Sequence, residues 1–161
     1  MVTLLIVLGV ALSPNSATEN SKADRILVSK SKRKLTLFRE NEVIKTYRIA
    51  LGKNPEGHKT QQGDGRTPEG MYRIDYRNPE SAYHLSLHIS YPNKRDAQRA
   101  KELGVTPGGD IMIHGIKNGL GWLGSLHRFF DWTDGCIAVT NAEIEEIWAL
   151  VPDGTLVEIN P

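Results

Sequence analysis

The sequence predicts a mainly β domain with two helices, arranged as a mixed, mostly antiparallel β-barrel or sandwich. Short strand-like segments with alternating or branched apolar residues recur along most of the chain. Turns rich in glycine, proline and charge separate them, and only two segments carry helical signals. A chain of 161 residues is long enough for one domain with its own core and too short for two.

The first part of the predicted domain is a β-meander that leads into a long loop. We expect the domain to begin at Arg25, and strands and turns to alternate over 26–29, 30–34, 35–38, 40–42 and 43–51. The basic segment 30–34 is interpreted as a solvated turn. Residues 52–70 are rich in glycine, proline and charge, which is typical of a loop, and a strand over 71–76 follows.

The second part of the chain carries both predicted helices. Asn93 as N-cap and Gly104 at the end delimit a short helix. Its inner face is expected to hold Ala97, Ala100 and Leu103. Thr140 and Glu143 form a capping box that begins a second helix with an apolar face. Strands are expected at 83–90, 110–114, 136–139 and 155–159, with a loop rich in glycine and aromatic residues at 115–135.

The first residues differ from the rest of the chain. Residues 3–12 are apolar, and this run is too short to cross a bilayer as a helix. Small and polar residues follow at 13–17, as in the cleavage zone of a secretory signal. We therefore expect a signal peptide or a short anchor at 1–17, a linker at 18–24, a folded domain at 25–161, and export to the periplasm or cell envelope.

Charge and cysteine content narrow the function. The net charge of +1 gives no basic face for nucleic acid, so no nucleic-acid partner is expected. Cys136 is the one cysteine, which excludes an intramolecular disulfide. An exported protein that retains a lone thiol is unusual, because such thiols are easily oxidised. Cys136 is therefore either a buried structural thiol or a reactive one.

The neighbours of Cys136 favour a nucleophile. Gly135 lets a substrate carbonyl approach the backbone, and the amides of Gly135 and Cys136 can face a developing oxyanion. Acyl transfer through cysteine also needs a base, which we expect to lower the pKa of the thiol. His114 closes a strand and is a rigidly mounted candidate. His127 is the alternative base because it lies nearer in sequence.

These residues resemble the L,D-transpeptidase catalytic domain, also called the YkuD domain. The family shows a His-Gly, a loop, and then Ser/Thr-x-Gly-Cys followed by an apolar residue. The matching segments here are Ile113-His114-Gly115 and Thr133-Asp134-Gly135-Cys136-Ile137, with Asn141. Thr67-Pro68-Glu69-Gly70 resembles the family's Thr-Pro-x-Gly, and Tyr91-Pro92-Asn93 with Asp96 resembles the branch of murein transpeptidases and amidases related to YafK. The resemblance covers roughly 25–159.

The resemblance implies a cysteine acyltransferase acting on peptidoglycan stem peptides in cell-wall remodelling. Cys136 would be the nucleophile and His114 the general base, oriented by the backbone carbonyl of Gly115. The acyl group would form a thioester at the L-centre carbonyl of meso-diaminopimelate, with release of D-alanine, and would pass to an amine. Hydrolysis of the same acyl-enzyme remains open, as L,D-carboxypeptidase or amidase activity. Such hydrolysis includes release of wall-linked protein, which makes a wall-linked lipoprotein a second candidate partner.

Thr133, Asp134, Gly135 and His127 are the candidates for substrate contact. Three features depart from the family pattern. Asp134 stands where the family usually has histidine, Ala138 where it often has arginine or asparagine, and His114 precedes Cys136 by 22 residues, a longer separation than usual. The Asp134 carboxylate can bond its own loop's backbone, hold a substrate ammonium or take part directly in catalysis. The loop-structuring role is favoured.

Two rival functions are a zinc amidase and a non-catalytic wall-binding domain. His84 and His88 have the spacing of a helical zinc pair, but the alternation of 83–90 indicates a strand. Four residues of strand separate them by about 13 Å, whereas zinc requires nitrogen ligands at about 2 Å. We therefore expect no metal and no cofactor. A wall-binding domain would not need both His114 and Cys136.

Overall fold

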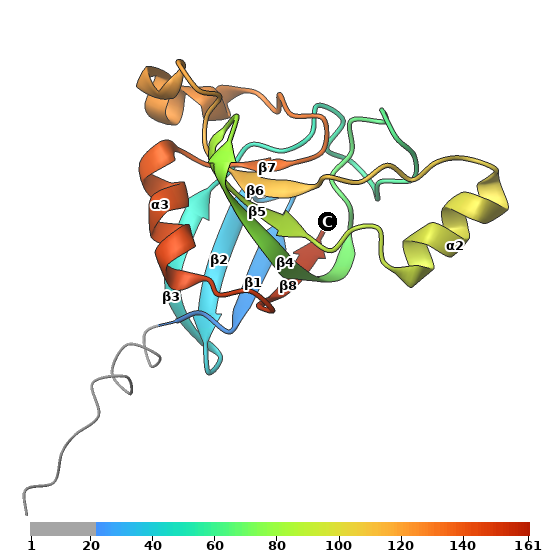
Figure 1. The fold of residues 1–161 in the computed structure, drawn as a ribbon, viewed down its shortest axis with the longest axis horizontal. Helices are drawn as coiled ribbons and strands as arrows, with labels where there is room; N and C mark the ends of the chain where they lie inside the picture. The colour runs from blue at the N-terminus through green and yellow to red at the C-terminus, as the bar shows by residue number, and fades with distance from the viewer. Residues whose placement is uncertain (1–21) are drawn as a thin grey trace, which may run out of the picture.

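The structure, a computed structural model, describes residues 22–161 as one curled sheet with helices around it (Figure 1). The strands are β1 (Arg25–Ser29), β2 (Lys34–Arg39), β3 (Glu42–Arg48), β4 (Gly70–Ser81), β5 (His84–Ile89), β6 (Met112–His114), β7 (Ile137–Ala138) and β8 (Leu156–Asn160). The helices are α2 (Lys94–Leu103), the 3₁₀ segment η1 (Gly121–Phe129) and α3 (Asn141–Leu150). The predicted segment 1–17 lies outside the described residues.

The sheet has the order β3-β2-β1-β8-β4-β5-β6-β7 and closes on itself. The long strand β4 changes register between Ile74 and Tyr76, so that its first part pairs with β8 and its second part with β5. After β3, Ala50 forms an antiparallel bridge with Ala138 of β7, with two backbone hydrogen bonds of 2.9 Å. Among the strand pairs within residues 22–161, β1–β8 and β6–β7 are parallel and the others are antiparallel. The prediction of a mixed, mostly antiparallel barrel is confirmed.

The core follows from strand alternation and from one amphipathic helix. Alternate residues of β1, β2 and β8 are almost fully buried, as a sheet with one face toward the core requires. Helix α3 starts at the predicted capping box, in which Thr140 Oγ1 accepts from the Glu143 N–H and Glu143 accepts from the Thr140 N–H. Its apolar face, Ile144 and Ile147, is buried against the sheet. Within residues 22–161 no helix is long and apolar enough to cross a membrane.

Helix α2 has the predicted caps but not the predicted inner face. Asn93 is the N-cap, and Gly104 adopts a left-handed conformation at the end. Ala97 and Leu103 are exposed, and the buried side chains are Asp96 and Ala100. The reason is that α2 lies at the side of the sheet (Figure 1) and is fixed at its N-terminal end by polar contacts. Asp96 accepts from the Tyr72 hydroxyl at 3.0 Å and lies 3.2 Å from His58 Nε2.

The basic turn before β2 is exposed at Lys32 and Lys34, as predicted for a solvated turn, but not at Lys30. Lys30 is buried, and its ammonium contacts the Gly57 carbonyl at 2.6 Å, the Thr67 carbonyl at 3.0 Å and Glu69 at 2.8 Å. Charge alone indicated a solvated turn, but the long loop 52–70 folds back over the turn and supplies acceptors to the ammonium. Lys30 therefore ties this loop to the sheet.

Lys30→Ala should lower the free energy of unfolding by about 3 kcal/mol, because it leaves the partly buried Glu69 carboxylate and two carbonyls without their donor. Urea denaturation measures the change. Lys32→Ala in the same turn is the control, since its side chain is exposed and its loss should be nearly silent. Equal effects of the two substitutions would contradict the buried anchoring role.

Candidate active site

The turn that carries Cys136 is closed by a threonine and requires a glycine. Thr133 Oγ1 accepts from the Gly135 N–H at 3.1 Å and donates to the Cys136 carbonyl at 2.8 Å. Gly135 has φ +129°, and a Cβ atom there would lie 2.6 Å from the Arg66 carbonyl oxygen. Thr133, and not Asp134, therefore bonds the loop's own backbone.

His114 lies on the strand next to this turn. β6 and β7 pair in parallel, with Ile113 opposite Ile137 and His114 opposite Ala138. Because side chains alternate along a strand, Cys136 and His114 belong to the same face of this pair. Both line a cleft of about 370 Å³. The other lining residues are Asn78, Ser81, Ala82, Tyr83, Asp110, Met112, Trp132, Thr133 and Asp134.

The imidazole of His114 has a defined orientation. Its Nδ1 lies 2.6 Å from the Gly115 carbonyl oxygen, which can only accept a hydrogen bond. Nδ1 therefore carries the proton, and Nε2 is left with a free lone pair. The turn after His114 is fixed as well, because the Gly115 N–H donates to the Tyr83 carbonyl and the Ile116 N–H donates to Asn141 Oδ1 at 2.8 Å. The Tyr83 ring lies 4.5 Å from the His114 ring.

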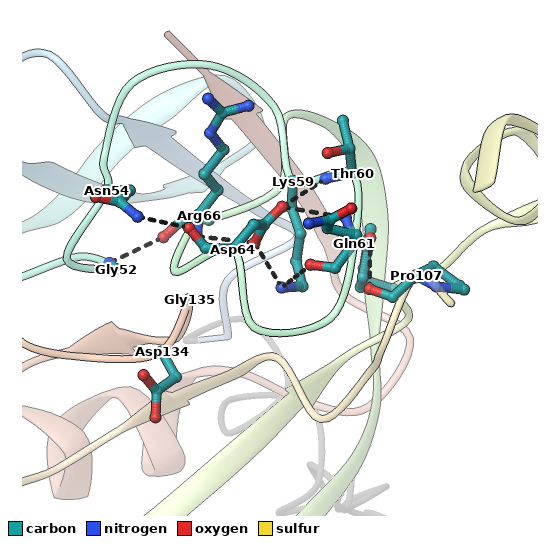
Figure 2. A network of polar contacts seen from close by, with 12 residues as sticks. Gly52, Asn54, Lys59, Thr60, Gln61, Asp64, Arg66, Pro107, Asp134 and Gly135 are labelled. Carbon is teal, nitrogen blue, oxygen red and sulfur yellow. Dashed lines mark hydrogen bonds and ion pairs between the residues drawn. The ribbon is translucent and has the colours of Figure 1, made fainter. Parts of the chain in front are cut away.

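The long loop 52–70 is organised around the Asp64 carboxylate (Figure 2). Asp64 accepts from the backbone N–H groups of Thr60, Gln61 and Arg66 at 2.8 to 3.1 Å. The buried ammonium of Lys59 donates to it at 2.9 Å. A side chain with four donors holds its loop in one conformation, and Figure 2 shows this loop beside Gly135.

Hydrogen bonds of the segment 50–53 connect this ordered loop to the turn that carries Cys136. The Lys53 N–H donates to the Thr133 carbonyl at 2.9 Å, and the Gly52 N–H donates to Thr67 Oγ1 at 3.2 Å. A Cβ atom on Gly52 would lie 2.2 Å from the Gly65 carbonyl oxygen. The segment 50–53 is thus held between the rest of the loop and the cysteine turn, with space for backbone alone at Gly52.

The model of the L,D-transpeptidase catalytic domain (YkuD) matches residues 23–159. The chain belongs to this family. YafK of Escherichia coli strain K12, which is named as an L,D-transpeptidase, is 30% identical over 132 residues, covering 78% of this chain and 46% of YafK. YkuD of Bacillus licheniformis, named in the same way, is 31% identical over 142 residues, covering 85% of this chain and 66% of YkuD. The chain therefore spans about half to two thirds of the length of these relatives.

A solved structure agrees with the sequence comparison. The helical cell shape determining protein Pgp2 of Campylobacter jejuni, as its K307A mutant, superposes with a TM-score of 0.65 and is 25% identical. The match covers 87% of this chain and 47% of that chain. An L,D-transpeptidase from Mycobacterium smegmatis, at 12% identity and a TM-score of 0.57, shares the fold. The predicted family and its β-barrel fold are confirmed.

Burial favours the neutral forms of both His114 and Cys136 in this L,D-transpeptidase-family domain. It lowers the pKa of His114, although the hydrogen bond to Gly115 opposes the change. It raises the pKa of Cys136 more than the Met112 N–H and the Lys59 charge lower it, and Asp134 and Asp110 raise it further. The thiol donates weakly to the Asp110 carbonyl, at 3.5 Å. The pKa of Cys136 is therefore raised and not lowered as expected, and the thiol and the imidazole are both neutral.

His127 lies outside the cleft that Cys136 lines. It is buried in η1, and its Nδ1 accepts from Trp132 Nε1 at 3.3 Å. Burial and the neighbouring Arg128 lower the pKa of His127 to about 4, although Glu143 opposes this. Trp132 stands between the two histidines, with its ring 5.8 Å from that of His114 and 6.2 Å from that of His127. The structure therefore places His114, and not His127, in the cleft that Cys136 lines.

Asp134 points away from the turn that carries it. Its side chain is 84% exposed, and Lys53 contacts it at 2.6 Å. The predicted loop-structuring role was therefore wrong, because Thr133 already satisfies the polar groups of the turn. An exposed carboxylate at the rim of the cleft remains able to meet a substrate ammonium. Its pairing with Lys53 offsets much of its charge.

The histidines of the rejected zinc pair contact different carboxylates. His84 Nε2 lies 2.7 Å from Glu145, and His88 Nδ1 lies 2.5 Å from Asp75. Residues 22–161 contain no group of three or more His, Cys, Asp or Glu side chains arranged to hold a metal ion. Both histidines belong to β5, as the alternation predicts.

Sequence reasoning missed three contributors to the site. Asp64 had a signal, since aspartate between two glycines is typical of a turn in which the carboxylate bonds nearby N–H groups. Tyr83 was assigned only to the apolar face of its strand, yet it lies against the His114 ring. Lys59 gave no signal, because its burial depends on the way the loop folds back.

Asp64→Asn should lower the free energy of unfolding by about 2 kcal/mol. Burial alone would raise the pKa of Asp64, but the hydrogen bonds from Thr60, Arg66, Lys59 and Gln61 lower it to about 2. This stabilisation is complete above the unfolded pKa near 4 and disappears as the pH falls towards 2. Urea titration at several pH values tests this, with the exposed Asp153→Asn as control. A wild-type advantage that persists at pH 2 would contradict the assignment.

Cys136 should be alkylated by iodoacetamide with a midpoint above the ordinary cysteine pKa, because burial disfavours the thiolate. Asp134→Asn should lower this midpoint by removing a like charge, and Lys59→Met should raise it. Stopped-flow alkylation across the pH range measures both shifts. A wild-type midpoint near neutral pH would show a preformed thiolate and contradict the neutral pair.

Proposed function

We propose that this chain is a cysteine acyltransferase that remodels peptidoglycan through a thioester on Cys136. The observation that carries the proposal is the placement of Cys136 and His114 on one face of the parallel pair β6–β7, in a shared cleft. Membership of the L,D-transpeptidase family supplies the substrate class, the stem peptides of peptidoglycan. The similarity to a protein that determines helical cell shape is consistent with a role in the wall.

In the first half-reaction, Cys136 Sγ attacks the L-centre carbonyl of meso-diaminopimelate in a stem peptide. The thiol turns from the Asp110 carbonyl, and its proton passes to His114 Nε2 as the carbon–sulfur bond forms. His114 then gives this proton to the amine of the terminal D-alanine, and the carbon–nitrogen bond breaks. A neutral imidazole is suited to the first transfer, and the imidazolium that results is suited to the second.

In the second half-reaction, an acceptor amine attacks the thioester. His114 accepts a proton from the amine, a carbon–nitrogen bond forms, and the carbon–sulfur bond breaks. The proton returns to the thiolate, which restores the neutral pair. The acceptor amine must therefore lie on the same side of the thioester as His114. A wall-linked lipoprotein would be attached at this step, by attack of its amine on the thioester, and would be released in the first half-reaction, with its amine as the leaving group.

Of the two backbone N–H groups that the sequence indicated as oxyanion donors, one is already hydrogen-bonded. The Gly135 N–H, expected to face the oxyanion, is bonded to Thr133 Oγ1. The Cys136 N–H is therefore the donor that we assign from this turn. Since such an enzyme works where the wall is built, we place the protein in the periplasm or cell envelope, as the segment 1–17 indicates.

Incubation of the protein with a disaccharide-tetrapeptide should release D-alanine and give a protein adduct of the acyl mass, detected by intact mass spectrometry. Cys136→Ala and His114→Gln should abolish or greatly slow the adduct, whereas His84→Ala, remote from the thiol, should not. Muropeptide analysis then separates cross-linked products from hydrolysed ones. An active Cys136→Ala variant would refute the mechanism, and tripeptide without cross-links would identify a hydrolase.

A further inference from the structure

A second hollow adjoins the catalytic cleft and differs from it in chemistry. Its volume is about 510 Å³, and its wall is almost entirely apolar. Leu120, Leu123, Leu126 and His127 come from η1 and the residue before it, and Tyr83, Ile116, Lys117, Phe130 and Trp132 complete the wall. Tyr83 and Trp132 also line the catalytic cleft, so the two hollows share a wall. We call this second hollow the η1 pocket.

The η1 pocket adjoins the catalytic cleft at the end where His114 lies. The His114 ring is 4.5 Å from Tyr83 and 5.8 Å from Trp132, the two residues that the hollows share. In the proposed reaction His114 exchanges its proton with the leaving or attacking amine. Groups attached to that amine therefore extend towards the η1 pocket, whereas the acyl group lies on the side of Cys136 away from it.

The wall also contains a hydrogen-bond donor without an acceptor. His127 Nδ1 accepts from Trp132 Nε1, so in the neutral ring Nε2 carries the proton. His127 Nε2 is buried and has no partner among residues 22–161. A buried unpaired donor costs free energy, which a ligand carbonyl or carboxylate oxygen would recover. Lys117 adds an exposed positive charge to the same wall.

We propose that the η1 pocket binds the amine-side substrate, and that this substrate carries a large apolar side chain next to a carbonyl or carboxylate. This inference rests on the proposed acyl transfer and names the class of one reactant. Neither the D-alanine that the first half-reaction releases nor a diaminopimelate acceptor has a large apolar side chain to fill the pocket. The occupant is therefore either a free apolar amino acid or an apolar residue at the amine end of a peptide.

The test compares acceptor amines on one preformed acyl-enzyme. The donor is the disaccharide-tetrapeptide, and the acceptors are glycinamide, leucinamide and phenylalaninamide in both configurations, free leucine, and leucyl-glycyl-glycine. Burial of one large side chain should favour leucinamide over glycinamide roughly tenfold to hundredfold in kcat/KM. Preference for free leucine over the tripeptide identifies an amino acid as the source, and the reverse identifies a peptide.

Two adjacent phenylalanines provide a matched control. Phe129 and Phe130 are 75% and 77% exposed, but only Phe130 lines the η1 pocket. Phe130→Ala should reduce the preference for leucinamide, and Phe129→Ala should leave it. His127→Phe keeps the ring size and removes the donor, so it should weaken acceptors that carry a carbonyl more than isobutylamine, which has none. Acyl-enzyme formation should be unchanged in the Phe129 variant.

Binding of an amine in the η1 pocket can also be measured by NMR in a variant that cannot react. In full-length Cys136→Ala, the imidazole ¹H–¹⁵N signals of His127 should show the Nε2–H tautomer and should move on addition of leucinamide but not glycinamide. If wild-type protein forms no acyl-enzyme, the proposed function fails. If it forms one but glycinamide reacts as well as leucinamide and the His127 signals stay in place, the pocket holds only water and this inference is overturned.

Discussion

The candidate site depends on backbone packing that leaves no room for side chains. Gly52 lies against the Gly65 carbonyl, and Gly135 lies against the Arg66 carbonyl, at distances that exclude a Cβ atom. The segment 50–53 is therefore fixed between the loop 52–70 and the cysteine turn. The same segment bridges β7 through Ala50 and so closes the barrel. Barrel closure and placement of the thiol are thus two consequences of one set of contacts.

This packing explains why a long, polar loop is ordered next to a reactive group. Three of its charged residues are directed inward, since Asp64 bonds Lys59 and Glu69 bonds Lys30 of the turn before β2. Buried charges are tolerated only when they are paired and hydrogen-bonded, and here backbone groups complete each set. The loop then presents the carbonyl oxygens of Gly65 and Arg66 at the positions where a Cβ atom of Gly52 or Gly135 would lie.

Burial of the thiol and imidazole has a chemical consequence. Burial disfavours the charged forms of both groups, and for Cys136 it outweighs the opposing effect of the Lys59 charge. A neutral thiol resists oxidation, because the thiolate is the reactive form. In the proposed reaction, the thiol leaves the Asp110 carbonyl and gives its proton to His114 only when a substrate carbonyl is present to be attacked.

The sequence was sufficient where local chemistry decides the structure. The Thr140–Glu143 capping box, the caps of α2 and the alternation of β5 follow from neighbouring residues. The pairing of His114 with the cysteine turn followed from a family pattern. Sequence reasoning failed where a distant segment supplies the partner. The burial of Lys30, the exposure of Leu103 and the role of Asp64 all depend on how loop 52–70 folds.

The departures from the family pattern acquire physical reasons in this fold. Ala138 is fully buried in the bridge to Ala50, which leaves no space for a long polar side chain. Asp134 is turned outward to Lys53, so the position next to Gly135 contributes charge at the rim and not a ring in the cleft. The long chain segment between His114 and Cys136 contains η1, and the apolar residues of η1 line the η1 pocket next to His114. In the proposed reaction, the amine approaches from the side of His114, which is the side that this added chain enlarges. The longer separation therefore changes the surroundings of the proposed acceptor and leaves Cys136 and His114 in one cleft.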